Sequence, residues 1–576
     1  MKTQTDAEKQ FITFLNSLYE EGSKFRKKTT QDWQHSIDIM QGKMWPEKRP
    51  SYKVNATMNF LAQVVEKKTA LLTDAKPVAN VVTRKKGLDE VCQILSKVID
   101  AIFEERGWEQ KLTEFVFLEQ YFGLSAINTC YDKSLDWGLG DIDFAVLDPR
   151  TFVFDPFITR SYNLNSGEYF CFETTRPTNY LQDKYSNKAD SIKADFSTDL
   201  QMREDSLLSK IRTLFKGKDE NKGLTSVIPR SVVRDFWIRD RKTKKDGKLL
   251  YPNWREVLVV GGCIVEDGSN PYIDGDLPVD MMEWDFNVNS AYGFNEVNKL
   301  EMAQIMFNKV LATIIENATL MGNGIWIGDT NALSDPDKAR LSNEPGSHVW
   351  KRPGTELRRE TGVALPAGLT QILTLLLGGI EKLSSITEAM EGRKPGQVTA
   401  GTAIESMQIA ASTVIRLKAR QIEALVQRIG QKLISRIFQY YTEDRVFNLT
   451  GKADGFTQFV YERSKIREAI QKTNGTMLTA FKDFQYKVVP ASSLALTKWQ
   501  KGLIAMQLYQ AKAIDRQALL EAVEYPNWEK ILDRTIEKQQ SGEEPIQTGK
   551  GQKLPKSVLR GGNKETGFQH PQKGKQ

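Results

Sequence analysis

Cysteine and histidine are scarce in this chain. Its 576 residues include four cysteines, without a CxxC pair, and three histidines, none close in sequence to another histidine or to a cysteine. These counts argue against a disulfide framework, a zinc site and histidine-centred catalysis. We expect buried thiols in a reducing cytoplasm, and neither a metal nor a cofactor. The residues are Cys92, Cys130, Cys171, Cys263, His35, His348 and His570.

Recognisable catalytic motifs are also missing. The sequence has no GxxxxGK[ST] loop for a nucleotide triphosphate, and no GxSxG, HExxH, EF-hand or SxxK pattern. The glycines of 321–328 follow a predicted helix rather than a strand, which disfavours a dinucleotide loop. Asp148 and Asp155 each precede a proline, as turn residues do. We therefore predict that the protein is not an enzyme.

Positive charge is concentrated at one end. The formal net charge is +7, and residues 546–576 contain seven Lys or Arg against one acid, so this tail carries +6 and the rest of the chain +1. A nearly neutral body excludes a global attraction to phosphates and leaves local contacts only. The Gly, Lys and Gln content of the tail predicts disorder.

The composition is that of a folded, multi-domain soluble protein. The N-terminal segment mixes acids into an amphipathic pattern, so we expect no secretory signal. Residues 361–380 lack charge over the length of a membrane span. Pro366, Gln371 and several glycines lower its apolarity, and the pattern continues past Glu381, so we predict a buried or subunit-facing helix instead.

Hydrophobic periodicity predicts an α+β fold. Helices are expected over most of the first hundred residues, with an extended piece at 77–83, and strands from about 125 to 290. Gly261-Gly262 between two apolar runs predicts a hairpin. Residues 185–225 are rich in Lys, Asp and Ser and predict a loop or insertion.

The second half is predicted to be mainly helical. Apolar residues three and four apart predict helices over 300–314, 369–386 and 402–441, and near 496–512 and 515–538. Between the first two lies a segment, 324–366, punctuated by Pro and Gly, with short strand-like pieces. Gly392, Pro395 and Gly396 end the second helix.

Several strings, taken in order, resemble the portal protein, or head-to-tail connector, of tailed double-stranded DNA bacteriophages. Their order covers about residues 30–535. The strings are Trp33 with Gly42–Trp45, Arg49, Asn55 and Asn59; LDPRTFVFDP at 147–156; 291–318, which includes Gln304 and Asn308; and 507–534.

The resemblance implies a ring of about twelve identical subunits at one capsid vertex, around a channel for packaging and ejecting the genome. The implied partners are other copies of the chain, the terminase large subunit, major capsid and scaffolding proteins, head-tail adaptor or tail proteins, and passing double-stranded DNA, with no membrane. Assembly is expected in the host cytoplasm and the final location in the virion.

The resemblance also implies a division of the chain into named parts. They are a mixed α/β wing at 1–290, a first stem helix at 291–321, a small α/β clip at 322–366, a second stem helix at 367–391, a tunnel loop at 392–401, a long wing helix and return at 402–490, a helical crown at 491–545 and a basic tail at 546–576. The loop at 392–401 is short and rich in glycine, which departs from the family pattern.

Three groups are candidate contact residues, each with a simpler alternative. Channel-facing candidates could instead cap a helix, which favours cations at its C-terminus. Clip candidates for terminase or adaptor contact could form a solvated face, and tail candidates for DNA contact could remain free. The groups are Arg393, Lys394 and Gln397 for the channel, Lys351, Arg352, Arg358 and Arg359 for the clip, and Lys550, Lys553, Lys556 and Arg560 for the tail.

Two other functions remain open from the sequence. One is a minor capsid or head-tail adaptor protein without its own channel, which ring size would distinguish. The other is a nucleic-acid-processing enzyme, disfavoured by the missing motifs and separable by a metal-dependent nuclease assay.

Overall fold

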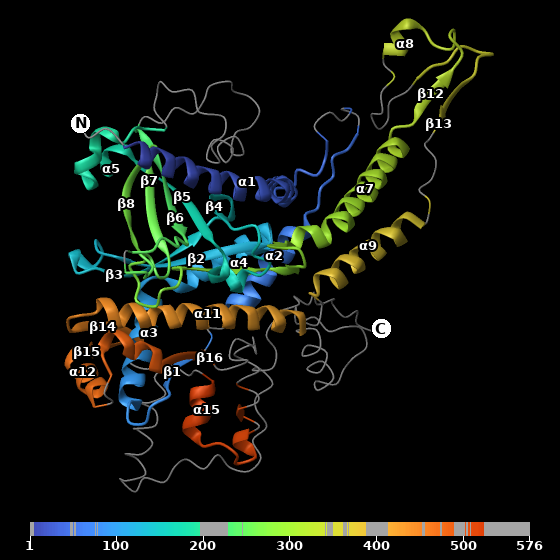
Figure 1. Cartoon of the computed structure of the whole chain (residues 1–576). Coiled ribbons are helices and arrows are strands. Elements are labelled where there is room, and N and C mark those ends of the chain that lie inside the picture. Colours follow the sequence, from blue (N-terminus) through green and yellow to red (C-terminus); the bar gives the residue numbers. More distant parts are fainter. Residues whose placement is uncertain are drawn as a thin grey trace. The chain divides into compact units, whose positions relative to one another are not determined.

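A computed structural model of the chain describes most of it. The described residues are 5–46, 53–74, 79–195, 228–244, 246–339, 349–360, 368–386, 413–451, 455–472, 475–488 and 508–523, with the single positions 50, 77, 341, 366, 502, 505 and 506. Two units are distinguished: residues 1–449 with 458–495, and residues 450–457 with 496–576. The first unit contains nearly all the described elements (Figure 1).

Helices dominate the N-terminal part, as predicted. The first begins with a capping box in which Thr5 and Glu8 exchange hydrogen bonds with each other's backbone. The fourth was not predicted, and glycines in the left-handed region, Gly107 and Gly123, flank it. The four helices are α1 (Asp6–Met40), α2 (Phe60–Thr73), α3 (Asp89–Glu105) and α4 (Trp108–Phe122).

Two antiparallel sheets follow. The three-stranded sheet has the order β3-β2-β9, and the five-stranded sheet the order β4-β5-β6-β7-β8. The predicted Gly-Gly hairpin is confirmed: β7 pairs with β8, and Gly261 and Gly262 have φ of 54° and 78°. The strands are β2 (Leu124–Asp132), β3 (Asp141–Leu147), β4 (Phe152–Phe154), β5 (Tyr169–Pro177), β6 (Arg230–Ile238), β7 (Arg255–Val260), β8 (Cys263–Ser269) and β9 (Val279–Glu283).

The acids before prolines in this region are turn residues, as predicted. The Asp148 carboxylate accepts a hydrogen bond from the backbone N–H of Arg150, and that of Asp155 from the backbone N–H of Phe157. Short α5 (Thr178–Lys184) precedes the predicted loop at 185–225, which begins with a 3-10 turn at Ser186–Ser191. Residues 196–227 lie outside the described part. Cys92, Cys171 and Cys263 are buried thiols, whereas Cys130 is only partly buried.

A long helix, α11 (Thr413–Tyr440), packs along the main apolar core of the first unit. Beside it, β1 (Ala79–Thr83) pairs antiparallel with β16 (Phe484–Val488). The Gln431 side chain forms hydrogen bonds with backbone groups on the free edge of β16. Its amide NH₂ donates to the carbonyl oxygen of Phe484 at 3.1 Å, and its amide oxygen accepts from the N–H of Tyr486 at 3.3 Å. The part of the predicted helix before Thr413 lies outside the described residues.

Several short elements follow α11 in the chain. They are β14 (Arg445–Gly451) and β15 (Gly455–Tyr461), which pair with each other, α12 (Arg463–Gln471), α13 (Met477–Ala480) and, in the second unit, α15 (Arg516–Ala522). α15 falls within the helix predicted at 515–538, whose remainder after residue 523 is outside the described part. Among the described helices, none combines the length and apolarity needed to cross a bilayer.

Gly430 lets the ring of Tyr486 lie against α11. A Cβ atom added at Gly430 would stand 2.1 Å from a ring carbon of Tyr486. Replacing Gly430 by Ala should therefore destabilise the fold by about 1–3 kcal/mol, as overpacking does. Urea unfolding measures the change. Gly379→Ala is the matched control, because nothing lies within 4 Å of its added Cβ; it should be neutral or slightly stabilising. A Gly430→Ala protein as stable as this control would contradict the packing.

Candidate functional site: the root of the α7–α9 pair

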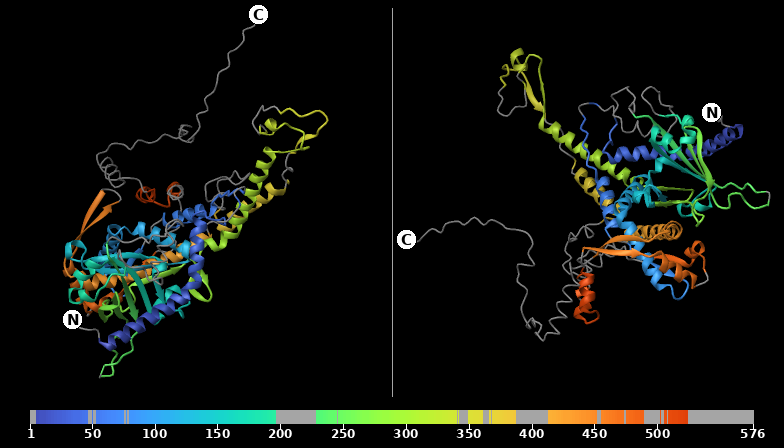
Figure 2. Two further views of the ribbon diagram at one scale, coloured as in Figure 1. Left: turned by 90° about the horizontal axis from the view of Figure 1, so that it is seen from above. Right: turned by 90° about the vertical axis from the view of Figure 1, so that its left-hand side faces the viewer.

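Two helices carry the chain away from the sheets and back. α7 (Glu296–Gly322) leads out and α9 (Gly368–Ser384) returns beside it, as Figures 1 and 2 both show. Between them lie β12 (Ile325–Gly328), α8 (Asp335–Ala339) and β13 (Leu357–Glu360). The sequence predicted both helices and strand-like pieces between them. The polar and apolar contacts at the start of α7 and the end of α9 are called the root below.

A hairpin and a cap fix the direction in which α7 starts. β10 (Asp285–Asn287) and β11 (Ser290–Phe294) lead directly into the N-cap residue, Asn295. Its side-chain oxygen accepts from the N–H of Asn298 at 2.8 Å, and its amide donates to the Ser36 hydroxyl at 2.9 Å and the Tyr121 carbonyl at 3.0 Å. The cap therefore ties α7 to α1 and α4.

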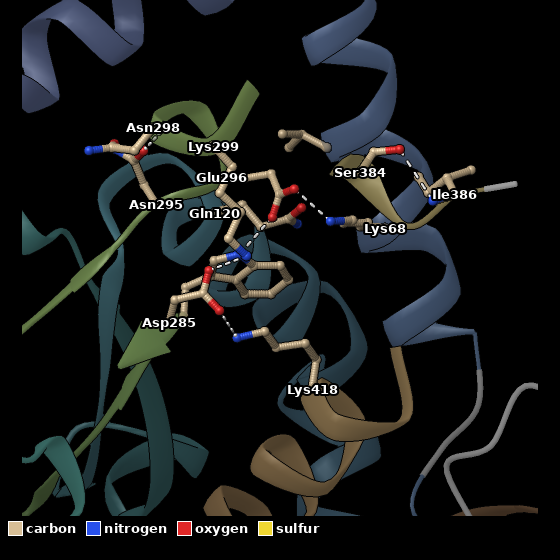
Figure 3. Close-up of polar contacts among 12 residues, drawn as sticks. Lys68, Gln120, Asp285, Asn295, Glu296, Asn298, Lys299, Ser384, Ile386 and Lys418 are labelled. Atoms are coloured by element: carbon tan, nitrogen blue, oxygen red, sulfur yellow. Dashed lines mark hydrogen bonds and ion pairs between the residues drawn. The ribbon is translucent and has the colours of Figure 1, made fainter. Parts of the chain in front are cut away.

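The first residue of α7 forms a fully buried ion pair. Glu296 accepts from the Lys68 ammonium of α2 at 2.6 Å and from the Trp284 indole N–H at 2.8 Å (Figure 3). Burial lowers the pKa of Lys68, against the opposing effect of Glu296. Both oxygens of the carboxylate are thus satisfied without water, which is the condition for a buried charge to be tolerated.

Asp285 joins α7 to α11. Its carboxylate pairs with Lys299 of α7 and, at 2.9 Å, with Lys418 of α11 (Figure 3). The Lys418 ammonium also lies 4.6 Å from the centre of the Trp284 ring. Burial would raise the pKa of Asp285, but the two lysines outweigh it and hold the pKa below its usual value.

Two further acids lie near this group. Glu119 of α4 is completely buried, and its carboxylate oxygens accept no hydrogen bond from any described residue. Burial raises its pKa well above the usual value, although Lys418 opposes the shift. Burial also raises the pKa of Glu283 on β9 to about 7. The root therefore contains both carboxylates paired with lysines and buried carboxyl groups whose pKa values are raised.

Two amide side chains hold the middle of α7 against the segment before α2. Gln304 accepts from the N–H of Phe60 at 3.0 Å and donates to the carbonyl oxygen of Met58 at 2.5 Å. Asn308 accepts from the N–H of Met58 at 3.1 Å. Gln304 and Asn308 are the two residues named in the string 291–318 on which the sequence resemblance rests. Both side chains are buried, so these hydrogen bonds satisfy their own polar atoms while they hold the backbone of residues 58–60.

The end of α9 returns to the same place. Ser385 has a φ of 61°, in the left-handed region, and turns the chain so that Ile386 becomes buried. The N–H of Ile386 donates to the Ser384 hydroxyl at 3.2 Å (Figure 3). Ile386 joins an apolar cluster built from α1, α2 and the start of α7. Its other buried members are Ile39, Met40, Leu61, Val64, Val65, Val297 and Leu300.

Away from this root, α9 is not a buried helix. Within the described residues only Ile380 and Ser384 of α9 are buried, and three large apolar side chains are exposed. Ile372 is 48%, Leu375 76% and Leu383 52% accessible. Of the two predictions for this uncharged helix, buried or subunit-facing, the first is therefore excluded for the isolated chain.

The four clip candidates lie at the opposite end of the pair, and all are exposed. β12 and β13 pair so that Ile327 faces Arg358 and Trp326 faces Arg359. Adjacent strand residues point to opposite faces, so Arg358 and Arg359 do not share a face. The four charges are near in sequence but do not form a single patch.

Local contacts occupy three of these cations. The Arg359 guanidinium lies 5.8 Å from the Trp326 ring centre, and Arg358 is 3.4 Å from the Glu360 carboxylate. Lys351 donates to a nearby backbone carbonyl oxygen at 3.1 Å. The other predicted groups, at 393–397 and 550–560, lie outside the described residues.

The root residues were not predicted as a group, because the partners are far apart in the chain. Lys68 and Glu296 are separated by 228 positions, and Asp285 and Lys418 by 133. Within the described residues, no group of three His, Cys, Asp or Glu side chains could hold a metal ion. The chemistry of the root is that of a rigid, desolvated joint.

Removing the cation of the buried pair should weaken the joint strongly. Lys68→Met keeps a side chain of similar length but removes the ammonium group that pairs with Glu296. The free energy of unfolding should fall by about 3–5 kcal/mol, because a buried carboxylate is left unpaired. Urea denaturation measures the loss. Lys9→Met removes an exposed pair with Asp6 and should change nothing measurable. Adding Glu296→Gln to Lys68→Met should restore much of the stability; a double variant no better than the single one would contradict the ion-pair explanation.

The raised pKa of Glu283 makes stability depend on pH. Its folded pKa of about 7 lies above the ordinary 4.5, so the folded state binds the proton more tightly than the unfolded state. This contribution is present in full below about pH 4.5 and is lost as the pH rises through 7. Glu283→Gln should remove a fall of about 3 kcal/mol between these limits. Unfolding midpoints at several pH values measure it, and parallel curves for variant and parent would contradict it.

Comparison with known proteins identifies the family of the chain. A search of curated proteins finds no match. The family model described as the phage P22-like portal protein matches residues 39–558, from the end of α1 to beyond α15. Because this match covers most of the sequence, the chain belongs to the P22-like portal protein family of bacteriophages.

Proposed function

We propose that this portal protein assembles into a closed ring at one capsid vertex, with a channel through which double-stranded DNA is packaged and later ejected. One observation carries the proposal: α7 and α9 are rigidly held at their root but expose apolar side chains along the rest of their length. Such an apolar surface is unfavourable in water on an isolated chain, whereas a ring of copies buries it between neighbours.

Three of the exposed apolar residues of α7 share a face. Met302 is 68%, Met306 42% and Leu320 64% accessible. At 100° per residue they lie opposite the face that carries buried Leu300 and Gln304. One side of α7 is therefore committed to its own chain, and the other is available to a neighbouring copy. A ring uses such heterologous contacts, in which two different surfaces of each copy meet.

The parts of the chain take their roles from this arrangement. We infer a wing from the sheets and α11, a stem from α7 and α9, a clip from the β12–β13 segment, a tunnel loop at 392–401 and a crown near α15. The clip residues Lys351, Arg352, Arg358 and Arg359 contact the terminase motor or an adaptor. The absence of a nucleotide-binding motif supports a non-enzymatic role, in which the separate motor performs the ATP-driven work.

Contacts with DNA are local and independent of sequence. A duplex that must slide is held by cations acting on phosphates, not by base readout. Arg393, Lys394 and Gln397 face the channel, and Lys550, Lys553, Lys556 and Arg560 contact packaged DNA from the tail. Scaffolding and capsid proteins surround the ring, and tail or adaptor proteins bind it after packaging.

Ring formation is the decisive test. Negative-stain electron microscopy of the purified protein, with its mass from light scattering, should show rings of about twelve subunits with a central hole. Leu375→Glu places a charge on the most exposed apolar position of α9 and should abolish the rings, while circular dichroism stays unchanged. Trp137→Glu, at another fully exposed residue, is the control and should still form rings.

Two results would contradict the proposal. A closed dimer or a compact oligomer without a hole would favour the adaptor alternative. Rings that persist in Leu375→Glu would show that α9 does not lie between copies.

A further inference from the structure

Four further large apolar side chains are exposed on segments near the root. Phe157 is 86%, Tyr162 56%, Phe286 55% and Val288 79% accessible. They come from two segments, residues 157–162 and the β10–β11 hairpin. We call these four residues the aromatic patch. Large aromatic side chains exposed together are typical of contact surfaces and uncommon on a solitary soluble protein.

Hydrogen bonds and a cation–π contact hold the two segments together. The Arg160 guanidinium lies 5.6 Å from the centre of the Phe286 ring and donates to the carbonyl oxygen of Asn287 at 2.7 Å. The N–H of Ala291 donates to the carbonyl oxygen of Ile158 at 3.3 Å. The hairpin therefore cannot move away from residues 157–162 without losing hydrogen bonds. The patch is a preorganised surface, which lowers the cost of binding.

The size of the patch suits part of a stable interface. With roughly 200 Å² for each aromatic side chain, the exposed fractions of its three aromatics amount to about 400 Å². A standard interface buries about 800 Å² on each partner. The patch would supply about half of that area, so it needs an adjoining surface to complete the interface.

The adjoining surface is the exposed face of α7. Phe286 directly follows Asp285, which is paired with Lys299 of α7. The same hairpin continues through Asn295 into the helix, whose exposed Met302 begins less than two turns later. The patch and the apolar face of α7 are thus fixed to one another by the root.

We propose that the aromatic patch packs against a neighbouring copy of this chain and forms one interface with the exposed face of α7. This inference rests on the proposed ring. A neighbour that covers Met302 and Met306 extends past the start of α7 onto the hairpin, where the patch continues the apolar surface. The root then fixes two contact surfaces at one angle, which a ring of defined size requires.

Thiol labelling of purified rings tests this contact directly. Val288→Cys and Trp137→Cys each introduce a thiol at a position that is open in the single chain. In rings, the Val288→Cys thiol should react with a maleimide at least ten times more slowly than the Trp137→Cys thiol. The parent chain, with three of its cysteines buried, gives the background rate. Because the rings contain only this chain, protection would identify a second copy as the partner. Equal rates at the two positions would overturn the proposal.

A charged substitution separates this inference from the proposed function. Val288→Asp should reduce the ring fraction at least tenfold without lowering the urea midpoint, because Val288 lies in the turn of the hairpin and is largely exposed. Trp137→Asp should leave the ring fraction unchanged. Parent rings together with intact Val288→Asp rings would overturn the patch as an interface and leave the proposed function standing. Failure of the parent chain to form rings would refute both.

Discussion

The buried charges around Trp284 and Asp285 are the constraint on which the rest of the first unit depends. These two adjacent residues meet three helices: α2 through Glu296 and Lys68, α7 through Glu296 itself, and α11 through Lys418. In an interior of low dielectric, an unpaired charge costs several kcal/mol, so each carboxylate holds its partners firmly. The direction of α7, the position of the β10–β11 hairpin and the start of α11 all follow from satisfying these charges together.

The two ends of the α7–α9 pair differ in how their charges are treated. At the root, the ions are desolvated and paired, and the buried side chains of Gln304 and Asn308 are likewise hydrogen-bonded, to the backbone of residues 58–60. At the opposite end, the cations of β13 and its approach remain exposed, with only weak local contacts. Buried ionic networks favour a single geometry, whereas exposed charges contribute little to stability and remain available for recognition. A fixed joint at one end and an accessible charged end at the other suit a subunit that must hold its place in an assembly while binding further partners.

Local signals explain which elements could be predicted. Short-range sequence patterns predicted the Gly-Gly hairpin and the long helices α7 and α11, and these predictions are confirmed. The root could not be predicted in this way, because Lys68 and Glu296 each look like solvated charges in their own helix. α4 was missed because its pattern includes Glu119 and Gln120 among apolar residues, and both are buried. The distinction between a buried helix and one that faces another subunit was left open for α9, since an uncharged sequence is compatible with both.

Charge burial and apolar exposure together argue that the single chain is an incomplete structure. A protein that functions alone usually places apolar residues inside and charges outside, but here the root buries Lys68, Glu296 and Lys418 while Leu375 and Phe157 face solvent. The desolvation cost of these charges is offset by the ion pairs and hydrogen bonds of the folded chain, so the root favours one geometry. That geometry sets the angle between the apolar face of α7 and the aromatic patch. In the proposed ring this angle relates neighbouring copies, so the buried ion pairs contribute to the geometry of the assembly as well as to the stability of one subunit.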